Sequence, residues 1–324
     1  MDASGTAGPR AVDAPEAAAI LARARTVILT GHRNPDGDCV GSVLGLAHVL
    51  RRRGAEVACF FPDGVPEAFR FLHGAAEVVR EVAAGAAPFD LAVALDCGDP
   101  RVLPRQWPGP RAYRALLVVD HHAVRNRFGD WTLVERAACV GQIVLRIAET
   151  LGYDLDRPLA EAVYVSLVTD TGFFRYPETT PEALRLAARL LEAGVSPWEV
   201  AYAVDEGYPA ARIEMLAAVL GTLGLHDAGR VAVLTVPPGL LERLGLGTEH
   251  LENVVNFARA VRGVEVAIQV RLNEEGKTRV SLRSCGRIDV AAIAALHGGG
   301  GHHNAAGCTV DASLEPAAAA IVAD

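Results

Sequence analysis

Apolar residues follow two different periods along the chain. Apolar runs of strand length occupy residues 27–29, 55–61, 89–95 and 115–119, and apolar residues return at helical spacing over residues 16–25, 39–53, 139–151, 159–168, 181–193 and 197–205. A mixed helical connection is expected over residues 65–84. Because strands that alternate with helices form parallel sheets covered by helices, this order predicts an α/β fold with a doubly wound, mostly parallel sheet over roughly the first 200 residues.

The pattern changes after residue 205. Helices are expected over residues 207–223 and 288–296, strands over 230–236, 264–272 and 278–283, and a hairpin turn over 273–277. A glycine-rich loop is expected at residues 298–307. These elements predict a second, smaller α/β domain. We therefore place the two domains at residues 16–205 and 226–324, with a linker helix at 206–225 between them.

Composition narrows the classes of protein that fit this outline. The 324 residues are 51% hydrophobic and 22% charged, which is typical of a globular protein. The net charge of -8 argues against a broad basic surface for duplex nucleic acid. Lys277 is the only lysine, so any local basic pocket must be built from arginines.

Three features indicate a cytoplasmic protein without a membrane partner. Residues 1–15 lack the basic head and apolar core of a signal peptide. No uncharged apolar run reaches the ~18 residues that a membrane span needs. The six cysteines are scattered and form no Cys-x-x-Cys pair, as expected of small buried residues in a reducing compartment.

Residues that can bind metals stand at the ends of four predicted elements. They are His32, Asp36 and Asp38; Asp96; Asp120, His121 and His122; and Asp170. Each cluster alone is compatible with an ordinary turn or a helix cap, since Asp-Gly and Asn-Pro pairs form turns and aspartate caps helices. Four clusters at successive element ends favour one shared site, because ligands of open α/β sheets bind at the carboxyl ends of the strands.

Carboxylates gathered in this way need cations, because like charges at close range cost several kcal/mol in a low dielectric. Oxygen and imidazole ligands without thiolate suit Mn²⁺ or Mg²⁺ better than a structural zinc ion. Two ions ~3.5–4 Å apart that share a carboxylate are the usual device for in-line attack on phosphorus. The residues therefore predict an enzyme that hydrolyses phosphate esters with two divalent cations.

The same residues carry a resemblance to a known family. The segments HRNPDGDCVGS (32–42), DCGD (96–99), DHH (120–122) and TDTGFFRY (169–176) resemble the four motifs of the DHH phosphoesterases. The segments SLRS (281–284) and GGGGHHNAAG (298–307) are similar to the accessory DHHA1 domain of these enzymes. The match spans nearly the whole chain, and a chain with these two domains only is most similar to the nanoRNase and pAp-phosphatase branch.

The resemblance implies a role for each site residue. One metal would be held by His32, Asp36 and Asp96, and the other by Asp38, Asp96, His121 and Asp170, with Asp96 shared. The catalytic pair would be His122, directed at the phosphate, and Asp120, which would orient a neighbouring histidine. The second domain would bind the substrate through Arg283, Ser284, Gly299, Gly300, Gly301 and His302. The active site is then expected in the cleft between the domains.

The resemblance also implies an activity. The enzyme would use Mn²⁺, with Mg²⁺ as the alternative, to degrade short oligoribonucleotides to nucleoside monophosphates and to dephosphorylate 3′-phosphoadenosine 5′-phosphate. Its partners would be short RNA or DNA oligonucleotides and phosphorylated nucleotides, and it would form a homodimer. The enzyme alternatives are a cyclic- or linear-dinucleotide phosphodiesterase and a pyrophosphatase or polyphosphatase. A long-strand RecJ-like exonuclease fits less well, because no further nucleic-acid-binding domain is present. The alternative outside enzymes is a nucleotide-binding sensor whose metal site only anchors a phosphate.

Overall fold

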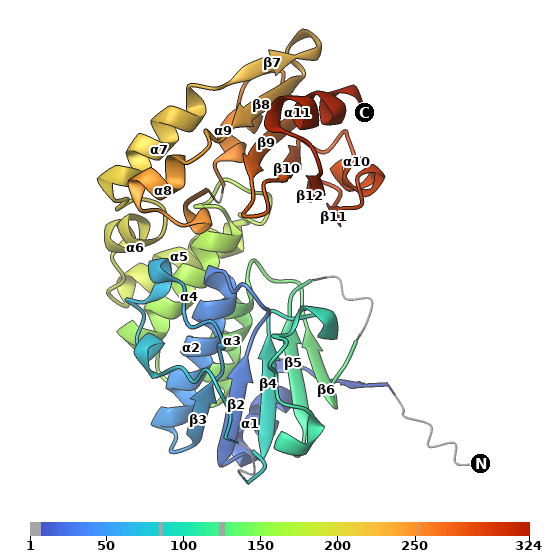
Figure 1. Ribbon diagram of the computed structural model, residues 1–324. Coiled ribbons are helices and arrows are strands. Elements are labelled where there is room, and N and C mark those ends of the chain that lie inside the picture. The colour runs from blue at the N-terminus through green and yellow to red at the C-terminus, as the bar shows by residue number, and fades with distance from the viewer. Residues whose placement is uncertain (1–7, 84–86, 123–126, 252) are drawn as a thin grey trace, which may run out of the picture. The chain divides into compact units, whose positions relative to one another are not determined.

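The computed structural model describes residues 8–83, 87–122, 127–251 and 253–324 of the chain (Figure 1). The chain divides into two compact units, Met1–Gly207 and Tyr208–Asp324, which are described in turn.

A six-stranded parallel sheet forms the centre of the first unit. Its strands are β1 (Arg10–Ala11), β2 (Thr26–Thr30), β3 (Glu56–Cys59), β4 (Leu91–Leu95), β5 (Leu116–Asp120) and β6 (Trp131–Val134). Their order is β1-β6-β5-β4-β2-β3, and every pairing is parallel. The chain passes from β2 outward to β3 and then returns to β4 on the other side of β2. The strand order therefore reverses at β2, which makes the gap between the ends of β2 and β4 the topological switch point where ligands bind in such sheets.

Helices cover one face of this sheet. They are α1 (Ala14–Arg23), α2 (Gly37–Arg52), α3 (Val140–Thr150), α4 (Arg157–Asp170), α5 (Pro181–Glu192) and α6 (Pro197–Val204). Alternate strand residues such as Val27 and Leu29 join the helices in one core, whereas Ile28 points to the other face, because side chains alternate along a strand. That second face is covered by loops and by a short 3-10 turn, Pro100–Val102, whose Val102 packs against the same core as Ile28.

The predicted α/β fold with a mostly parallel sheet is confirmed, with three differences in detail. The sequence pattern did not reveal β1 or β6, which are only two and four residues long. Residues 65–84 were expected to be partly helical, and their described part forms only 3-10 turns at Glu67–Phe69 and Ala75–Glu77.

A row of glycines lets α2 and α4 pack backbone against backbone. Gly37, Gly41 and Gly45 recur every four residues along α2 and therefore lie on one side of the helix. A Cβ atom at Gly41 would overlap the carbonyl oxygen of Ala162 in α4, and one at Gly37 would overlap the side chain of Thr169. We call this contact the glycine seam. Because it brings the two helices close together, it also brings the acidic residues at their ends within reach of each other.

The second unit contains a mixed six-stranded sheet. Its strands are β7 (Gly224–His226), β8 (Val231–Thr235), β9 (Val266–Leu272), β10 (Thr278–Ser284), β11 (Gly300–His302) and β12 (Ala305–Val310), in the order β11-β12-β10-β9-β8-β7. Only β8 and β9 are parallel. The helices are α7 (Ala210–Leu220), α8 (Leu240–Leu244), α9 (Val255–Arg259), α10 (Val290–Leu296) and α11 (Leu314–Ala323). The core of α7, α8 and α9 lies on one face of the sheet and that of α10 and α11 on the other.

The glycine-rich segment is the main correction in this unit. Residues 298–307 were expected to form a loop, but β11 and the start of β12 pair as an antiparallel hairpin, with Gly300 opposite Gly307 and His302 opposite Ala305. Glycine has a low strand propensity, so the sequence alone does not indicate this hairpin. The hairpin forms because β12 is already paired with β10, so that β11 can add to the free side of β12.

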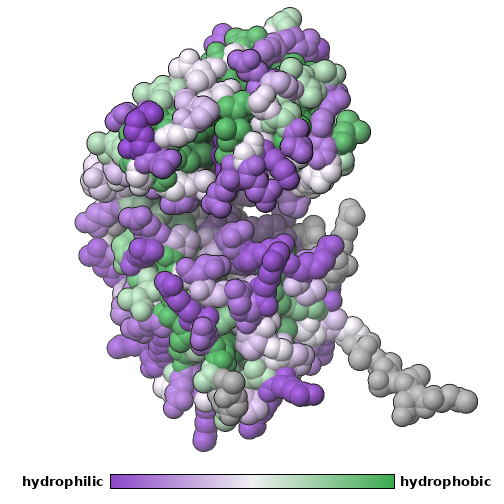
Figure 2. Space-filling view, viewed as in Figure 1, coloured by the Kyte–Doolittle hydropathy of each residue, from purple (hydrophilic) through white to green (hydrophobic). Residues whose placement is uncertain are grey.

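The surface of both units is mostly hydrophilic in the view of Figure 2, where hydrophobic residues form small separate patches. None of the helices described here is long and apolar enough to cross a membrane.

Candidate metal centre

The predicted metal ligands of the first unit come together at the switch point of its sheet. His32 and Asp36 follow β2, and Asp96 follows β4. Asp36 is also the N-cap of α2, where its carboxylate accepts a hydrogen bond from the Cys39 N–H at 3.0 Å. The cap and the metal-ligand interpretations of Asp36 are therefore compatible.

The first group of ligands consists of His32, Asp36 and Asp96, which offer atoms within 4.8 Å of one another. The Nε2 atom of His32 lies 3.6 Å from Asp36 Oδ1 and 3.3 Å from Asp96 Oδ2. Its other ring nitrogen, Nδ1, lies 2.9 Å from the carbonyl oxygen of Arg33. A carbonyl can only accept, so Nδ1 carries a proton and Nε2 is the atom that faces the carboxylates.

The second group consists of Asp38, His121 and Asp170 and has the same design. The Nε2 atom of His121 lies 3.1 Å from Asp170 Oδ2 and 3.7 Å from Asp38 Oδ2. Its Nδ1 atom lies 3.1 Å from the carbonyl oxygen of Ala137, which again leaves Nε2 for a cation. Asp170 is the last residue of α4, so it does not cap a following helix.

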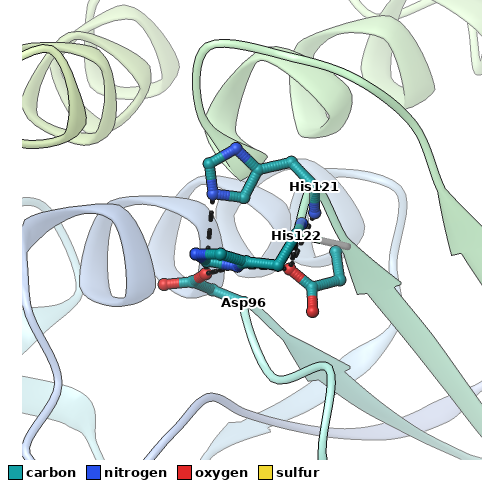
Figure 3. A group of neighbouring side chains, drawn as sticks. Asp96, His121 and His122 are labelled. Carbon is teal, nitrogen blue, oxygen red and sulfur yellow. Dashed lines mark hydrogen bonds and ion pairs between the residues drawn. The ribbon is translucent and has the colours of Figure 1, made fainter. Parts of the chain in front are cut away.

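Asp96 connects the two groups. Its Oδ2 faces His32, whereas its Oδ1 lies 4.0 Å from His121 Nε2 and 3.5 Å from His122 Nδ1 (Figure 3). Asp96 Oδ1 and His121 Nε2 are both buried, and neither has a hydrogen-bond partner in the described part of the chain. Asp96 also has a positive φ of 53°, a conformation that costs energy for a residue other than glycine and clusters at functional sites.

The main chain of α3 holds Asp38 in place. Asp38 is fully buried, and its carboxylate accepts hydrogen bonds from the N–H groups of Val140 and Gly141 at the start of α3 and from the Ser166 hydroxyl. A helix N-terminus stabilises a negative charge through its free N–H groups. Sequence reasoning missed Ser166, although it stands four residues before Asp170 on α4 and so on the same side of that helix.

Asp120 and His122 form a hydrogen-bonded pair beside the two groups. His122 Nδ1 donates to Asp120 Oδ1 at 2.9 Å, and the same oxygen accepts from the backbone N–H of His121 at 2.7 Å. Asp120 is fully buried, whereas the His122 side chain is 65% exposed. Asp120 therefore fixes the ring of His122 and leaves its Nε2 atom on the open side.

The pKa shifts reflect the burial and the crowded negative charge of this cluster. Burial lowers the pKa of His32, but hydrogen bonds to Asp36 and Asp96 outweigh it and raise the pKa to about 11. Burial, together with the charges of Asp96 and Asp36, raises the pKa of Asp170 to about 7, although His121 opposes that shift. Burial also raises the pKa of Asp38 well above its usual range. Without cations the cluster binds protons, and divalent cations can take their place.

The donor set fits divalent cations of the Mn²⁺ and Mg²⁺ class. It consists of carboxylate oxygens and imidazole nitrogens. Two nearby thiols do not add to it, because burial raises the pKa of Cys39 and Cys139 well above the usual range and keeps them protonated. The buried atoms without partners, the fixed imidazole tautomers and the shared carboxylate all match a two-ion centre.

The second unit contains the residues expected to bind substrate. Arg283 on β10, Ala305 on β12 and His302 on β11 stand directly opposite one another across three strands, so Arg283 and His302 lie on the same face of the sheet. Gly300 lies opposite Gly307 on that face and leaves its backbone open, since a Cβ atom there would meet nothing within 4 Å.

The other predicted substrate residues have structural roles. Ser284 is buried on the opposite face, where its hydroxyl lies 3.0 Å from Asn304 Oδ1, because neighbouring residues of a strand point in opposite directions. Cβ atoms at Gly299 and Gly301 would overlap the backbone of β12, so these glycines allow the hairpin to close. We therefore leave Ser284 out of the proposed site.

The fold and this centre together define the class of the protein, a metal-dependent hydrolase. The chain belongs to the DHH family: the model of the DHH family N-terminal domain matches residues 26–167, and that of the DHHA1 domain matches residues 229–324.

Similar proteins cover nearly the whole chain. The bifunctional oligoribonuclease and PAP phosphatase NrnA of Thermus thermophilus is 34% identical over 289 residues, which are 88% of this chain and 84% of that protein. The protein of the same name from Bacillus subtilis is 27% identical over 88% of this chain and 89% of its own length. A solved structure of an exopolyphosphatase-related protein from Bacteroides fragilis has a TM-score of 0.86 and 22% identity, and covers 96% of this chain and 95% of its own. That likeness shows a shared fold.

Proposed function

We propose that the protein is a two-metal phosphoesterase that degrades short oligoribonucleotides to nucleoside monophosphates and removes the 3′-phosphate of 3′-phosphoadenosine 5′-phosphate. The two NrnA relatives described above carry both activities in their names. The observation that carries the proposal is Asp96, whose two oxygens face two separate groups of ligands. Such sharing is what a two-ion phosphoesterase requires.

The proposed ligands are His32, Asp36 and Asp96 for one ion and Asp38, Asp96, His121 and Asp170 for the other. When bound, a pair of divalent ions neutralises phosphoryl oxygens and lowers the pKa of water towards neutrality. Asp38 and Asp120 are held by N–H groups of the main chain, so the charged groups are fixed before substrate arrives.

His122 is the proposed catalytic residue that contacts substrate. Asp120 accepts a hydrogen bond from Nδ1 of its ring and so fixes the ring's orientation. The Nε2 atom can then donate a hydrogen bond to a phosphoryl oxygen or a proton to the leaving oxygen. Arg283 and His302 of the second unit are the proposed partners of a second phosphate or a chain end, because an arginine can bind a phosphate through two parallel hydrogen bonds.

We propose Mn²⁺ as the ion. Mg²⁺ keeps several waters and usually takes only one or two carboxylates, whereas this centre offers two imidazoles and several carboxylates from the protein. We also propose a homodimer, which follows from the family resemblance, and a cytoplasmic location, which fits six cysteines that are all free thiols. Analytical ultracentrifugation of the purified chain tests the dimer.

A turnover panel tests the reaction and the ion together. The purified protein is given a dinucleotide, a short RNA, a long RNA, 3′-phosphoadenosine 5′-phosphate, a cyclic dinucleotide and pyrophosphate, each with Mn²⁺ or Mg²⁺. We expect the dinucleotide, the short RNA and 3′-phosphoadenosine 5′-phosphate to turn over fastest, and faster with Mn²⁺. A preference for pyrophosphate or for the cyclic dinucleotide would contradict the proposed substrates. Equal product release by the wild type and Asp96→Ala would leave a nucleotide-binding sensor instead of an enzyme.

A further inference from the structure

One buried hydroxyl links the three helices that meet beside the candidate metal centre. Ser166 of α4 is fully buried. Its Oγ atom donates a hydrogen bond to Asp38 Oδ1 at the start of α2 and accepts one from the N–H of Gly141 in α3 at 2.9 Å. An ionised carboxylate can only accept, which fixes the direction of the first bond. Figure 1 shows α2, α3 and α4 packed side by side, and Ser166 joins all three.

Two glycines hold the Ser166 side chain in place. A Cβ atom at Gly141 would lie 2.3 Å from Ser166 Oγ, and one at Gly41 would lie 3.2 Å from Ser166 Cβ. The main chains of α2 and α3 therefore fill the space on both sides of the serine, and a side chain packed in this way keeps one rotamer. Packing and hydrogen bonding together hold the hydroxyl against Asp38.

The two oxygens of the Asp38 carboxylate have different surroundings. Oδ1 accepts from the Ser166 hydroxyl and from the N–H groups of Val140 at 3.0 Å and Gly141 at 3.2 Å. A carboxylate oxygen has about two lone pairs, so Oδ1 has none to spare. Oδ2 shares the Val140 N–H, at 2.8 Å, and is the oxygen that lies 3.7 Å from His121 Nε2. Oδ2 is therefore the oxygen that is available to a cation.

The Ser166 hydroxyl contributes most to this difference. The Val140 N–H is shared between the two Asp38 oxygens, and the Gly141 N–H is shared between Asp38 Oδ1 and Ser166 Oγ. In the described part of the chain, the hydroxyl is the donor that Oδ1 shares with no other acceptor. Without it, Oδ1 would keep only two shared hydrogen bonds and could turn towards an ion.

We propose that Ser166 is a positioning residue that keeps Asp38 to one metal-binding oxygen, Oδ2, and so favours octahedral ions such as Mn²⁺ over Ca²⁺. Ca²⁺ takes about 6–8 oxygen ligands and binds carboxylates through one oxygen or both. Octahedral coordination is typical of Mg²⁺ and Mn²⁺, and the narrow bite of a two-oxygen carboxylate distorts an octahedron. The inference rests on the proposed function, because Asp38 belongs to the proposed two-ion centre.

Calorimetric titration of the metal-free full-length protein with Mn²⁺ and with Ca²⁺ tests the role of Ser166. Ser166→Ala should weaken the binding of one Mn²⁺ ion by about 10–100-fold, which is the usual effect of losing a group that orients a metal ligand. It should weaken Ca²⁺ binding much less, because the released Oδ1 can join the larger ion. A general loosening of the helices would weaken both ions by the same factor, so the ratio of the two affinities separates positioning from packing.

Ser42→Ala is the matched control. Ser42 is also fully buried, but its hydroxyl donates to the main-chain carbonyl oxygens of Asp38 at 2.6 Å and Cys39 at 3.2 Å and makes no contact with the carboxylate. This variant should keep the wild-type ratio of the two affinities. Thermal melts in EDTA confirm that each variant is folded.

A crystal structure of the wild type with Mn²⁺ is the second measurement, and it requires no substituted chain. We expect the ion on Asp38 Oδ2, with Ser166 still bonded to Oδ1. Three outcomes would overturn the role of Ser166: an unchanged ratio of affinities in Ser166→Ala, an equal change in Ser42→Ala, or Asp38 bound to Mn²⁺ through Oδ1 or through both oxygens.

The proposed function fails by a different result. A wild type that binds Mn²⁺ with the expected preference over Ca²⁺, but hydrolyses none of the proposed substrates, would contradict the proposed function and leave the role of Ser166 intact. Absence of Mn²⁺ binding by the wild type would contradict both.

Discussion

In the first unit, buried carboxylates and imidazoles crowd at the carboxyl edge of a parallel sheet, whereas in the second unit arginines lie across the face of a mainly antiparallel one. The first arrangement concentrates carboxylates, and the second concentrates guanidinium groups. Asp96 Oδ1 and Gln269 Oε1 illustrate the contrast, since both are buried without hydrogen-bond partners in the described chain, one beside imidazoles and the other beside arginines. The contrast fits the proposed roles, in which the first unit would bind metal and the second would bind substrate.

The largest effect should come from the shared carboxylate. Asp96→Asn removes the negative charge between the two groups of ligands and should lower turnover by roughly 10³-fold or more, while a variant of the second unit should not. Initial rates with saturating substrate and Mn²⁺ measure this effect. Asp154→Asn is the matched control, because Asp154 is exposed and lies outside the centre. A turnover within tenfold of the wild type would contradict a shared ligand.

A substitution in the glycine seam should reduce activity almost as strongly. Gly41→Ala places a methyl group against the backbone of α4 and should destabilise the first unit by about 1–3 kcal/mol, with loss of activity, because α2 and α4 carry ligands. The three tryptophans all lie in this unit, so their fluorescence during urea unfolding follows it. Gly109→Ala is the control, since its Cβ atom would meet nothing within 4 Å. Equal stability of the two variants would contradict the close packing of α2 against α4 at Gly41.

Without metal, the first unit should lose stability as the pH rises through neutrality. The folded-state pKa values of Asp170, about 7, and His32, about 11, lie above their unfolded values, so the folded state binds more protons than the unfolded state. The stability of the metal-free protein should therefore fall between about pH 5 and pH 8, by several degrees in melting temperature at about 2–4 °C per kcal/mol. Tryptophan-detected melts in EDTA measure the slope, and Mn²⁺ should flatten it. A stability that rises over this range would contradict the crowding of carboxylates.

A substitution in the second unit should change substrate affinity more than turnover. Arg283→Ala should raise KM by about tenfold and change kcat much less, because it removes a phosphate partner and no ligand of the ions. Arg283→Lys keeps the charge without the paired hydrogen bonds and should recover part of the loss. Steady-state kinetics with a dinucleotide separate the two constants. An unchanged KM together with a lowered kcat would place Arg283 in the chemistry itself.

The smallest effect should come from a carboxylate that has partners. Asp156 caps α4, and it accepts hydrogen bonds from Tyr153 and contacts His48 at 2.8 Å. Burial alone would raise the pKa of Asp156, but these partners lower it, so its contribution is present above about pH 4 and is lost as the pH falls. Asp156→Ala should cost about 1 kcal/mol at neutral pH.

Urea unfolding at pH 7 and at about pH 3 measures the Asp156→Ala cost on both sides of the range in which the contribution is lost. Asp156→Asn is the matched variant, since asparagine keeps the cap and removes the titration. If the two variants were equally destabilised, the contacts of the carboxylate with Tyr153 and His48 rather than the cap would be the source of the effect.

Sequence reasoning located the centre because its residues follow from topology. Strands that alternate with helices form a parallel sheet, and residues after its strands meet at one edge, so His32, Asp96 and His121 could be grouped before any coordinates. The hydrogen bonds that hold the Asp38 carboxylate could not be predicted in this way. They come from main-chain N–H groups at the start of α3, and any residue type carries such a group.

The second unit was harder to predict. Ser284 was expected beside Arg283, although the two-residue period of a strand already turns them to opposite faces. The hairpin at Gly300 forms through pairing with distant strands, against local propensity.

The carbonyl groups of Arg33 and Ala137 have one further consequence for how the centre fills. They fix a proton on Nδ1 of His32 and His121, so the opposite nitrogen of each ring is the one that must give up any proton it holds when an ion arrives. Because its hydrogen bonds to carboxylates raise the pKa of His32, loading the proposed centre would exchange hydrogen ions for metal, and acid would compete with the metal for the same lone pair.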